Sequence, residues 1–454
     1  MMSVLDFPFY KIAKLYREKA LSPIEVVKET LKRLKKLEPT LNAFIEIFEE
    51  EALNKARLLE TKFVAEEHLS ILAGIPFTVK DLFDTKDRVT TCGSRILKAN
   101  VANQTADVVQ LVLEQDSILI GKTNLLEFAY GVVHPDYGQT NNPWDPSRTA
   151  GGSSGGSAAA IAAGLGYFSF GTDTGGSIRI PASYCGIAGL KPTFGRLSDK
   201  GVFPLSWSLD HVGPMAKSAQ ELSILMDALL EQQSFTQWSD VKLDPVSELT
   251  QPIRVGFLPD EVLQVVDPEV ACIYDQTRQQ IQDLGWQVIP ISIEDWEAAE
   301  TLLMKILLPE ATFIHRHWLE RQSDYAPGTY SQLESGLKQG ALDYIDGLKG
   351  QQKFKRMVEA VFHSCEVIVM PTVSFPAPSE DPLIGDDERN ELIFTGPFNV
   401  SGHPAVTINA GFTKEGLPVG MQWVGPLYQD QILLKIAAYF EQKHPINRKL
   451  MLLD

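Results

Sequence analysis

The sequence has few cysteines and no long apolar run. Its 454 residues include four cysteines, none of them in a C-x-x-C pair: Cys92, Cys185, Cys272 and Cys365. A disulfide framework or a zinc site needs denser or more closely grouped cysteines. The longest uncharged apolar stretch lies within residues 158–170, too short for the about 20 residues that span a bilayer. The first 19 residues mix charged side chains into their apolar positions, unlike a signal peptide. These absences predict reduced thiols and a soluble, cytoplasmic protein without a membrane partner.

Positive charge and metal-binding patterns are also scarce. The 41 lysines and arginines are outnumbered by 58 aspartates and glutamates, which gives a net charge of −17. Broad contact with a phosphate backbone needs the opposite balance, so no direct nucleic-acid partner is expected. The eight histidines form no H-E-x-x-H or comparable ligand spacing, so we expect neither a metal ion nor another cofactor.

Helical and strand-like segments alternate along the chain. Ser22-Pro23-Ile24-Glu25 combines an N-cap serine, a proline at the first helical position and a capping-box glutamate, which predicts a helix ending before Pro39. Residues 73–79 predict a strand with Lys80 and Asp81 at its end. The other predicted strands are 117–121, 253–258, 287–291 and 367–370, and the other predicted helices are 49–67, 108–113, 268–284 and 431–442, with residues 293–348 mostly helical.

This alternation predicts an α/β fold with helices on the faces of a sheet. No internal repeat and no Pro/Ser/Gly-rich linker divides the chain. We expect one continuous domain, in which an N-terminal helical segment (residues 1–70) packs on a core formed by residues 71–454.

Charge nearly disappears between Thr149 and Ser177. Asp173 is the only charged residue in that span, whereas the 22% charged residues of the whole chain predict about six. Residues 151–195 contain twelve glycines, and glycine occurs where a backbone turns tightly or approaches a ligand closely. The span predicts a loop, a buried helix over residues 158–163 and a second loop.

Two familiar catalytic patterns are present but incomplete. Residues 151–155 satisfy G-x-S-x-G, but a nucleophile elbow must follow a strand, and residues 146–150 predict none. His211, beside Asp210, is the best candidate partner for a Ser-His-Asp triad, although a structural loop histidine is the favoured interpretation.

The run from Gly171 to Arg179 offers a different chemistry. Amide hydrolysis needs a nucleophile, a base and hydrogen-bond donors for the oxyanion. The small residues around Ser177 let consecutive backbone N–H groups point into one space. Lys80 can act as the base if burial lowers the pKa of its amine, while the alternative is an ordinary solvated lysine.

Three long motifs then carry a family resemblance: G-G-S-S-G-G-S-A-A-A (residues 151–160), G-T-D-T-G-G-S-I-R-I-P-A (171–182) and G-I-A-G-L-K-P-T (186–193). They resemble the amidase signature, so the chain is similar to the amidase-signature hydrolases. The resemblance extends from G-I-P-F-T-V-K-D (74–81) to F-N-V-S-G-H-P-A (398–405), which is most of the chain. It implies the fold of that family, a large mixed β-sheet covered by helices on both faces.

The resemblance also implies a Ser–cis-Ser–Lys triad. Lys80 matches the lysine, Ser153 matches the bridging serine that follows a cis peptide bond, and Ser177 matches the nucleophile. The oxyanion site would be the backbone N–H groups of Thr174, Gly175, Gly176 and Ser177. Ser154 and an Asp173–Arg179 pair would support these loops. Strand alternation further predicts that Lys80 faces the serine loops while Asp81 faces away.

Three functions fit the resemblance. The first is hydrolysis of a small carboxylic amide through an acyl-enzyme on Ser177, releasing ammonia or an amine. The second is the glutamine-hydrolysing A subunit of a glutamyl-tRNA(Gln) amidotransferase, which works with partner subunits. The third, a noncatalytic scaffold, is disfavoured because every triad position is filled.

Two features favour the small-amide hydrolase. Where the amidotransferase subunit carries a substrate-reading aspartate, this chain aligns Leu392, although the neighbouring Glu391 would restore a carboxylate if the alignment slipped by one. The expected pocket residues Phe128, Tyr130 and Gly131 lie in a segment whose two aromatic rings suit an apolar or aryl amide. We assign the pocket wall to residues 128–133 and 293–338. The expected partners are the amide substrate and either a second copy of the chain or, under the amidotransferase hypothesis, other subunits.

Overall fold

The computed structural model describes residues 3–230, 252–384, 390–446 and 450. Its strands are β1 (Phe44–Ile47), β2 (Pro76–Lys80), β3 (Ile118–Thr123), β4 (Phe168–Asp173), β5 (Ala188–Lys191), β6 (His211–Ala216), β7 (Arg254–Phe257), β8 (Gln287–Pro290), β9 (Val367–Pro371), β10 (Ala405–Phe412) and β11 (Pro418–Val424). Its α-helices are α1 (Phe9–Arg17), α2 (Pro23–Leu41), α3 (Glu49–Val64), α4 (Asp107–Glu114), α5 (Gly155–Ala162), α6 (Arg179–Cys185), α7 (Ala219–Leu230), α8 (Pro268–Asp283), α9 (Ala298–His315), α10 (Pro327–Leu337), α11 (Ala341–Val361), α12 (Gly396–Ser401) and α13 (Asp430–Lys443).

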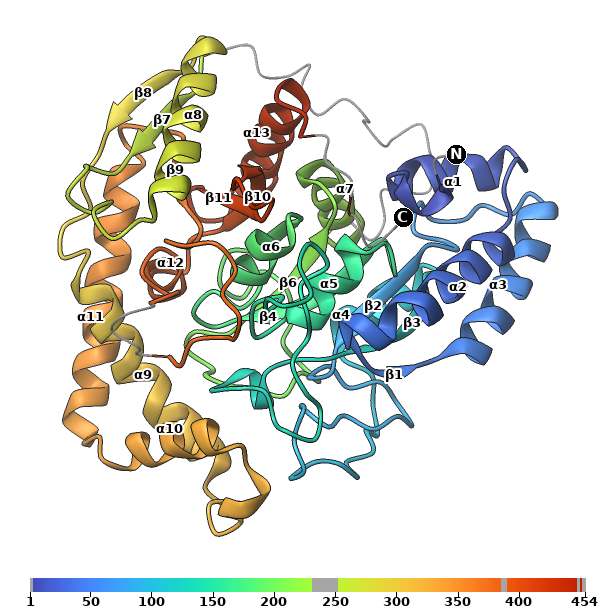
Figure 1. Cartoon of the computed structure of the whole chain (residues 1–454), viewed down its shortest axis with the longest axis horizontal. Coiled ribbons are helices and arrows are strands. Elements are labelled where there is room, and N and C mark those ends of the chain that lie inside the picture. The colour runs from blue at the N-terminus through green and yellow to red at the C-terminus, as the bar shows by residue number, and fades with distance from the viewer. Residues whose placement is uncertain (1–2, 231–251, 385–389, 447–449, 451–454) are drawn as a thin grey trace.

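The eleven strands form one sheet that crosses the molecule (Figure 1). Their order is β1-β3-β2-β4-β6-β5-β10-β11-β9-β7-β8. β2 pairs in parallel with β3 and β4, and β7 pairs in parallel with β8 and β9, while the other pairs are antiparallel. The predicted large mixed sheet is confirmed.

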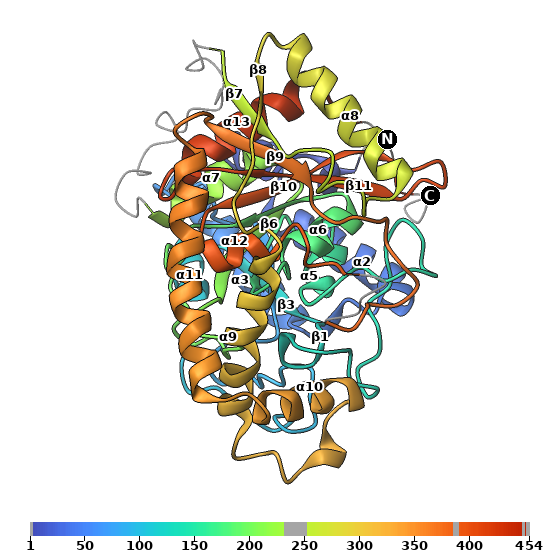
Figure 2. The same ribbon diagram turned by 90° about the vertical axis from the view of Figure 1, so that its left-hand side faces the viewer.

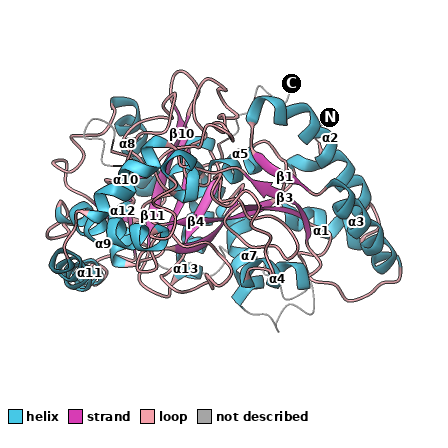
Figure 3. Ribbon diagram, turned by 90° about the horizontal axis from the view of Figure 1, so that it is seen from below, coloured by secondary structure: helices cyan, strands magenta, loops and turns pink. Residues whose placement is uncertain are grey.

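Helices cover both faces of this sheet. Seen from below, α5 lies on one face, and α7 and α13 lie on the other (Figure 3). α9 and α11 stand outside this sandwich beside α12, and α10 packs on α9 (Figure 2). A hydrophobic cluster runs through the sheet, and a second one joins α2 and α3 to α5 over β3. No helix within the described ranges combines the length and the apolar composition needed to cross a bilayer.

Most predicted elements are present, and three expectations are wrong. The capping box at Ser22 and Glu25 starts α2, but the helix runs past Pro39 to Leu41. Pro39 lies in the last turn, where its missing N–H costs a single bond, and Asn42 ends the helix in the left-handed conformation (φ 50°).

The other two errors are missed strands. β1 lies within the segment predicted to be helical, as a short edge strand antiparallel to β3. β4 replaces the second predicted loop, and all six of its residues are buried. A strand covered on both faces has no polar alternation, so periodicity did not identify it. The division of the chain into an N-terminal helical segment (residues 1–70) and a core (residues 71–454) stays a prediction.

The end of β2 turns two adjacent charged side chains in opposite directions. Asp81 forms a fully buried ion pair with Lys122 of β3, whose Nζ lies 2.5 Å from Asp81 Oδ1. Its other oxygen accepts the N–H and the hydroxyl of Thr91, at 2.9 and 2.5 Å. Burial raises the pKa of Asp81, and Lys122 opposes that rise. Asp81 therefore faces away from Lys80, as alternation along the strand predicts.

Removal of one partner of this pair should destabilise the fold. Lys122→Met leaves the Asp81 carboxyl buried without its cation, which should lower the free energy of unfolding by roughly 3–5 kcal/mol. Urea unfolding followed by tryptophan fluorescence should show a clear fall in the midpoint. Lys35→Met is the matched control, because Lys35 pairs with Glu49 at the surface (2.6 Å), where such pairs contribute about 0–1 kcal/mol. Equal shifts in the two variants would contradict a structural role for the buried pair.

Candidate active site

Three elements bring the predicted triad residues to one edge of the sheet. β2 and β4 are parallel neighbours, so their carboxyl ends lie side by side. Lys80 ends β2, Ser177 follows β4 in the turn that leads into α6, and Ser153 precedes α5. The loop before α5 lies next to both strand ends, so Lys80, Ser153 and Ser177 come together although Lys80 and Ser177 are nearly a hundred positions apart in the sequence.

The amine of Lys80 lies inside the protein between two hydroxyl groups. Its Nζ is 2.7 Å from Ser153 Oγ and 2.9 Å from Thr172 Oγ1, and its side chain is fully buried. Burial lowers the pKa of Lys80 to about 7, although the negative charges of Asp173 and Asp210 oppose that shift. A large share of Lys80 is therefore neutral at neutral pH, as a base requires.

The loop before α5 lies against the turn that carries Ser177. The Gly152–Ser153 peptide bond is cis, as the resemblance implies. The N–H of Ser154 donates to the carbonyl of Ser177 (3.1 Å), and the Ser154 hydroxyl donates to the carbonyl of Thr172 (3.3 Å). Ser154 thus ties the two loops together.

Residues Thr174–Ser177 present unpaired backbone donors. Among the described residues, none accepts a hydrogen bond from these four N–H groups. Thr174, Gly175 and Gly176 are buried, and buried backbone N–H groups are seldom unpaired in native proteins, so this run indicates a place for an acceptor. Ser177 itself is partly exposed, and its hydroxyl makes no hydrogen bond within the described chain. The expected Ser153–Ser177 link is therefore not formed in this structure.

The Asp173–Arg179 pair braces this turn. Both side chains are fully buried, with Arg179 Nη2 2.8 Å from Asp173 Oδ1 and Nε 2.9 Å from Oδ2. Asp173 also accepts from the N–H of Ile178 (3.2 Å). Burial raises the pKa of Asp173, but the charge and hydrogen bonds of Arg179 outweigh it and hold this pKa below its usual range. The pair fixes both ends of the turn that holds Ser177.

Contacts from the C-terminal third of the chain were missed by sequence reasoning. Arg179 donates to the carbonyl of Thr395 (3.0 Å), to Asn399 (2.6 Å) and to Gln422 (3.1 Å). The Thr395 hydroxyl donates to the carbonyl of Gly175 at 2.6 Å. The F-N-V-S-G-H-P-A motif, which contains Asn399, was the one sequence feature that pointed to this segment, and it did not indicate a contact with Arg179.

Apolar side chains cover the turn beside Gly175. A β-carbon at Gly175 would lie 3.3 Å from Leu392 Cδ2 and 3.8 Å from Leu303 Cδ1 of α9. The neighbouring Glu391 accepts the hydroxyl of Tyr184 on α6 (2.7 Å), and burial together with the charge of Asp381 raises the pKa of Glu391. The side chain beside the turn is thus leucine, and the nearby carboxyl is engaged with Tyr184.

The predicted pocket aromatics lie in packed surroundings. Phe128 is fully buried, with its ring centroid 4.4 Å from that of His315 and 5.1 Å from that of Phe203. Tyr130 is also fully buried, and Gly131 packs closely against Thr329 of α10. Their contact with substrate stays a prediction.

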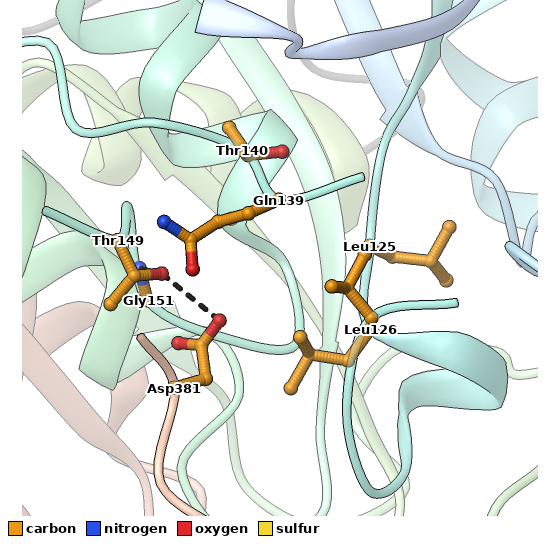
Figure 4. A pocket seen from close by; sticks show the side chains of 9 residues that line it. Leu125, Leu126, Gln139, Thr140, Thr149, Gly151 and Asp381 are labelled. Atoms are coloured by element: carbon orange, nitrogen blue, oxygen red, sulfur yellow. Dashed lines mark hydrogen bonds between the residues drawn. The ribbon is translucent and has the colours of Figure 1, made fainter. Parts of the chain in front are cut away.

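A small cavity lies behind the serine loop. It is lined by residues that include Leu126, Gln139, Gly151 and Asp381, and the Thr149 hydroxyl donates to Asp381 at 2.9 Å (Figure 4). Its volume is about 10 Å³, room for about one water molecule.

His211 is buried at the start of β6, where its Nδ1 lies within hydrogen-bond distance of the carbonyls of Asp173 and Leu209. Within the described ranges, no group of three or more His, Cys, Asp or Glu side chains is placed to hold a metal ion.

Known proteins resemble this chain along nearly its whole length. The amidase family model matches residues 25–434. In Picosynechococcus sp., the A subunit of glutamyl-tRNA(Gln) amidotransferase is 34% identical over 94% of this chain and 96% of its own. The putative amidase AmiD of Mycobacterium tuberculosis is 32% identical over 97% of this chain and 94% of its own.

Solved structures agree with these relatives. A crystal structure of an amidase has a TM-score of 0.86 at 29% identity and covers 96% of this chain and 100% of that one. The structure of 6-aminohexanoate cyclic dimer hydrolase has a TM-score of 0.87 at 26% identity and covers 100% of both chains. Since the family model and these relatives span nearly the whole sequence, the chain belongs to the amidase family and is a carbon–nitrogen hydrolase.

Proposed function

We propose that this chain hydrolyses the C–N bond of a small carboxylic amide through an acyl-enzyme on Ser177. The observation that carries the proposal is the buried amine of Lys80, which lies 2.7 Å from Ser153. The four backbone N–H groups of residues 174–177, which no described residue pairs with, complete it. A base and an oxyanion site thereby flank Ser177.

The residues would move the proton in a relay. Neutral Lys80 accepts the proton of the Ser153 hydroxyl, while Ser153 accepts that of Ser177 as Ser177 Oγ bonds to the amide carbon. The carbonyl oxygen, now negative, accepts hydrogen bonds from the N–H groups of residues 174–177. The proton then returns through Ser153 to the leaving nitrogen, the C–N bond breaks, and water hydrolyses the acyl-enzyme by the same relay.

The surroundings of the turn support an apolar acyl group. Leu303 and Leu392 lie against Gly175, and Glu391 is engaged with Tyr184. Glutamine hydrolysis is the second candidate, favoured by the 34% identity to the A subunit of an amidotransferase. Against it, a free glutamine carries two charges, which are costly to bury without partners, and the side chains against Gly175 are leucines.

Replacement of the nucleophile tests the proposal directly. Ser177→Ala should lower kcat by on the order of 10⁴-fold or more, because only the attacking oxygen is removed. Ser153→Ala should be nearly as damaging, since Lys80 loses its path to Ser177, while Ser154→Ala should retain more activity. The rate of ammonia release from each purified variant measures these losses of activity. Turnover near wild type in Ser177→Ala, or a greater loss in Ser154→Ala than in Ser153→Ala, would overturn these assignments.

The pH profile should report the charge of Lys80. The base is neutral above its pKa of about 7, so kcat/KM should rise as pH increases through about 7 and level off above it. Lys80→Arg should be almost inactive across this range, because a guanidinium stays protonated. Lys35→Arg, at the surface, is the control and should match wild type. An active Lys80→Arg enzyme would exclude the lysine as base.

A substrate panel separates the two candidate functions. Neutral amides such as butyramide and benzamide should be hydrolysed with a kcat/KM at least about tenfold above that of glutamine, because the leucines cannot pair with its charges. A coupled ammonia assay, with Ser177→Ala as the background, measures each rate. Glutamine as the best substrate would reject the small-amide assignment and favour the amidotransferase one.

A further inference from the structure

A carboxylate outside the proton relay holds the start of the oxyanion turn. The Thr174 hydroxyl donates to Asp210 Oδ1 at 2.6 Å. Asp210 Oδ2 accepts the backbone N–H groups of Leu205 and Ser206, at 2.8 and 3.0 Å. One side chain therefore joins the turn at residue 174 to the loop at residues 205–206, which lies about 30 positions further along the chain.

The same loop is attached to the helix that covers the turn. The Ser206 hydroxyl donates to Glu310 Oε2 (2.6 Å), and the Ser208 hydroxyl donates to Glu310 Oε1 (2.6 Å). Tyr344 of α11 donates to Glu310 Oε1 as well (2.8 Å). Glu310 lies on α9, as does Leu303, which packs on Gly175. A continuous chain of hydrogen bonds thus runs from α11 through Glu310, Ser206 and Asp210 to Thr174.

The placement of a carboxylate here carries an electrostatic cost. Asp210 raises the pKa of Lys80, which opposes the neutral form that the base needs. A negative charge near a developing oxyanion is also unfavourable. The carboxylate compensates for this cost by fixing geometry. When ionised it accepts all three hydrogen bonds at once, whereas a protonated carboxyl group would have one acceptor position fewer.

We propose that Asp210 is a positioning residue that, through the Thr174 hydroxyl, aims the backbone N–H groups of the turn at the oxyanion. This inference rests on the proposed function and adds a residue that the relay does not contain. Thr174 cannot rotate while its hydroxyl is held, so its own N–H stays directed into the site. Oxyanion donors act strongly only when they are fixed in place before the reaction.

Titration of Asp210 should then appear in the pH profile. Burial raises the pKa of Asp210 to about 6, while hydrogen bonds from Thr174, Leu205 and Ser206 lower it and the charge of Glu310 raises it. The charge of Asp210 acts in turn on Lys80, as does the charge of Asp173. Both Lys80 and Asp210 must lose a proton for full activity, but protonation of Asp210 weakens one hydrogen bond and should lower activity only about tenfold. Lys80 gives log(kcat/KM) a slope of one below its pKa, and wild type should show an extra drop of about tenfold near pH 6. Asp210→Asn should lack this extra drop, because it carries the loss at every pH.

The main test uses Thr174 and needs no knowledge of the natural amide. A fluorophosphonate reacts when Ser177 Oγ bonds to phosphorus and fluoride leaves, with the serine proton passing to Ser153 and Lys80. Its phosphoryl oxygen occupies the oxyanion site, so the labelling rate reports on the N–H groups. Thr174→Val keeps the branched shape without the hydroxyl and should slow labelling about tenfold, the effect of one such hydrogen bond. Thr174→Ser restores the hydroxyl and should recover the rate.

Two controls make the outcome decisive. Thr277→Val removes the hydroxyl of another buried threonine, which donates to the carbonyl of Ile273 within α8, and should label at the wild-type rate. An unchanged rate in Thr174→Val, or an equal loss in Thr174→Ser, would overturn the positioning role while leaving the proposed function intact. If peptide mass analysis finds no label on Ser177 of the wild-type enzyme, the proposed function fails and this inference fails with it.

Discussion

The neutral amine of Lys80 is the constraint on which the site depends. Burial without a carboxylate partner lowers the pKa of a lysine, and here the amine of Lys80 makes its hydrogen bonds with two hydroxyls. The adjacent Asp81 does not restore the charge, because it faces the other way and pairs with Lys122. The sheet therefore keeps the amine of Lys80 apart from the carboxylate of Asp81, the next residue in the sequence.

Rigid support surrounds this amine. β2 and β4 hold Lys80 and the start of the Ser177 turn as parallel neighbours, and the Asp173–Arg179 pair fixes that turn from behind. The C-terminal segment around Thr395 and Asn399 completes the brace. A displacement of the reacting groups by about 1 Å lowers the rate strongly. A small site is therefore held in place by contacts from segments along most of the chain.

The sequence predicted local features better than distant contacts. The capping box of α2, the strand before Lys80 and the opposite directions of Lys80 and Asp81 all follow from short-range patterns. β4 was missed because a strand buried on both faces shows no polar alternation, and β1 because a four-residue edge strand carries little signal. Three further partners of Arg179 (Thr395, Asn399 and Gln422) lie more than two hundred residues away, where neither spacing nor composition indicates a contact.

The most direct test of this account is the pKa of Lys80 in the free enzyme. NMR of protein labelled with ¹³C at the lysine Cε, assigned by comparison with Lys80→Met, would follow the titration of this one amine. We expect a midpoint at about pH 7, well below that of the exposed lysines. A midpoint near the usual lysine value of about 10.4 would show that the amine is charged at working pH, and would contradict its role as the base.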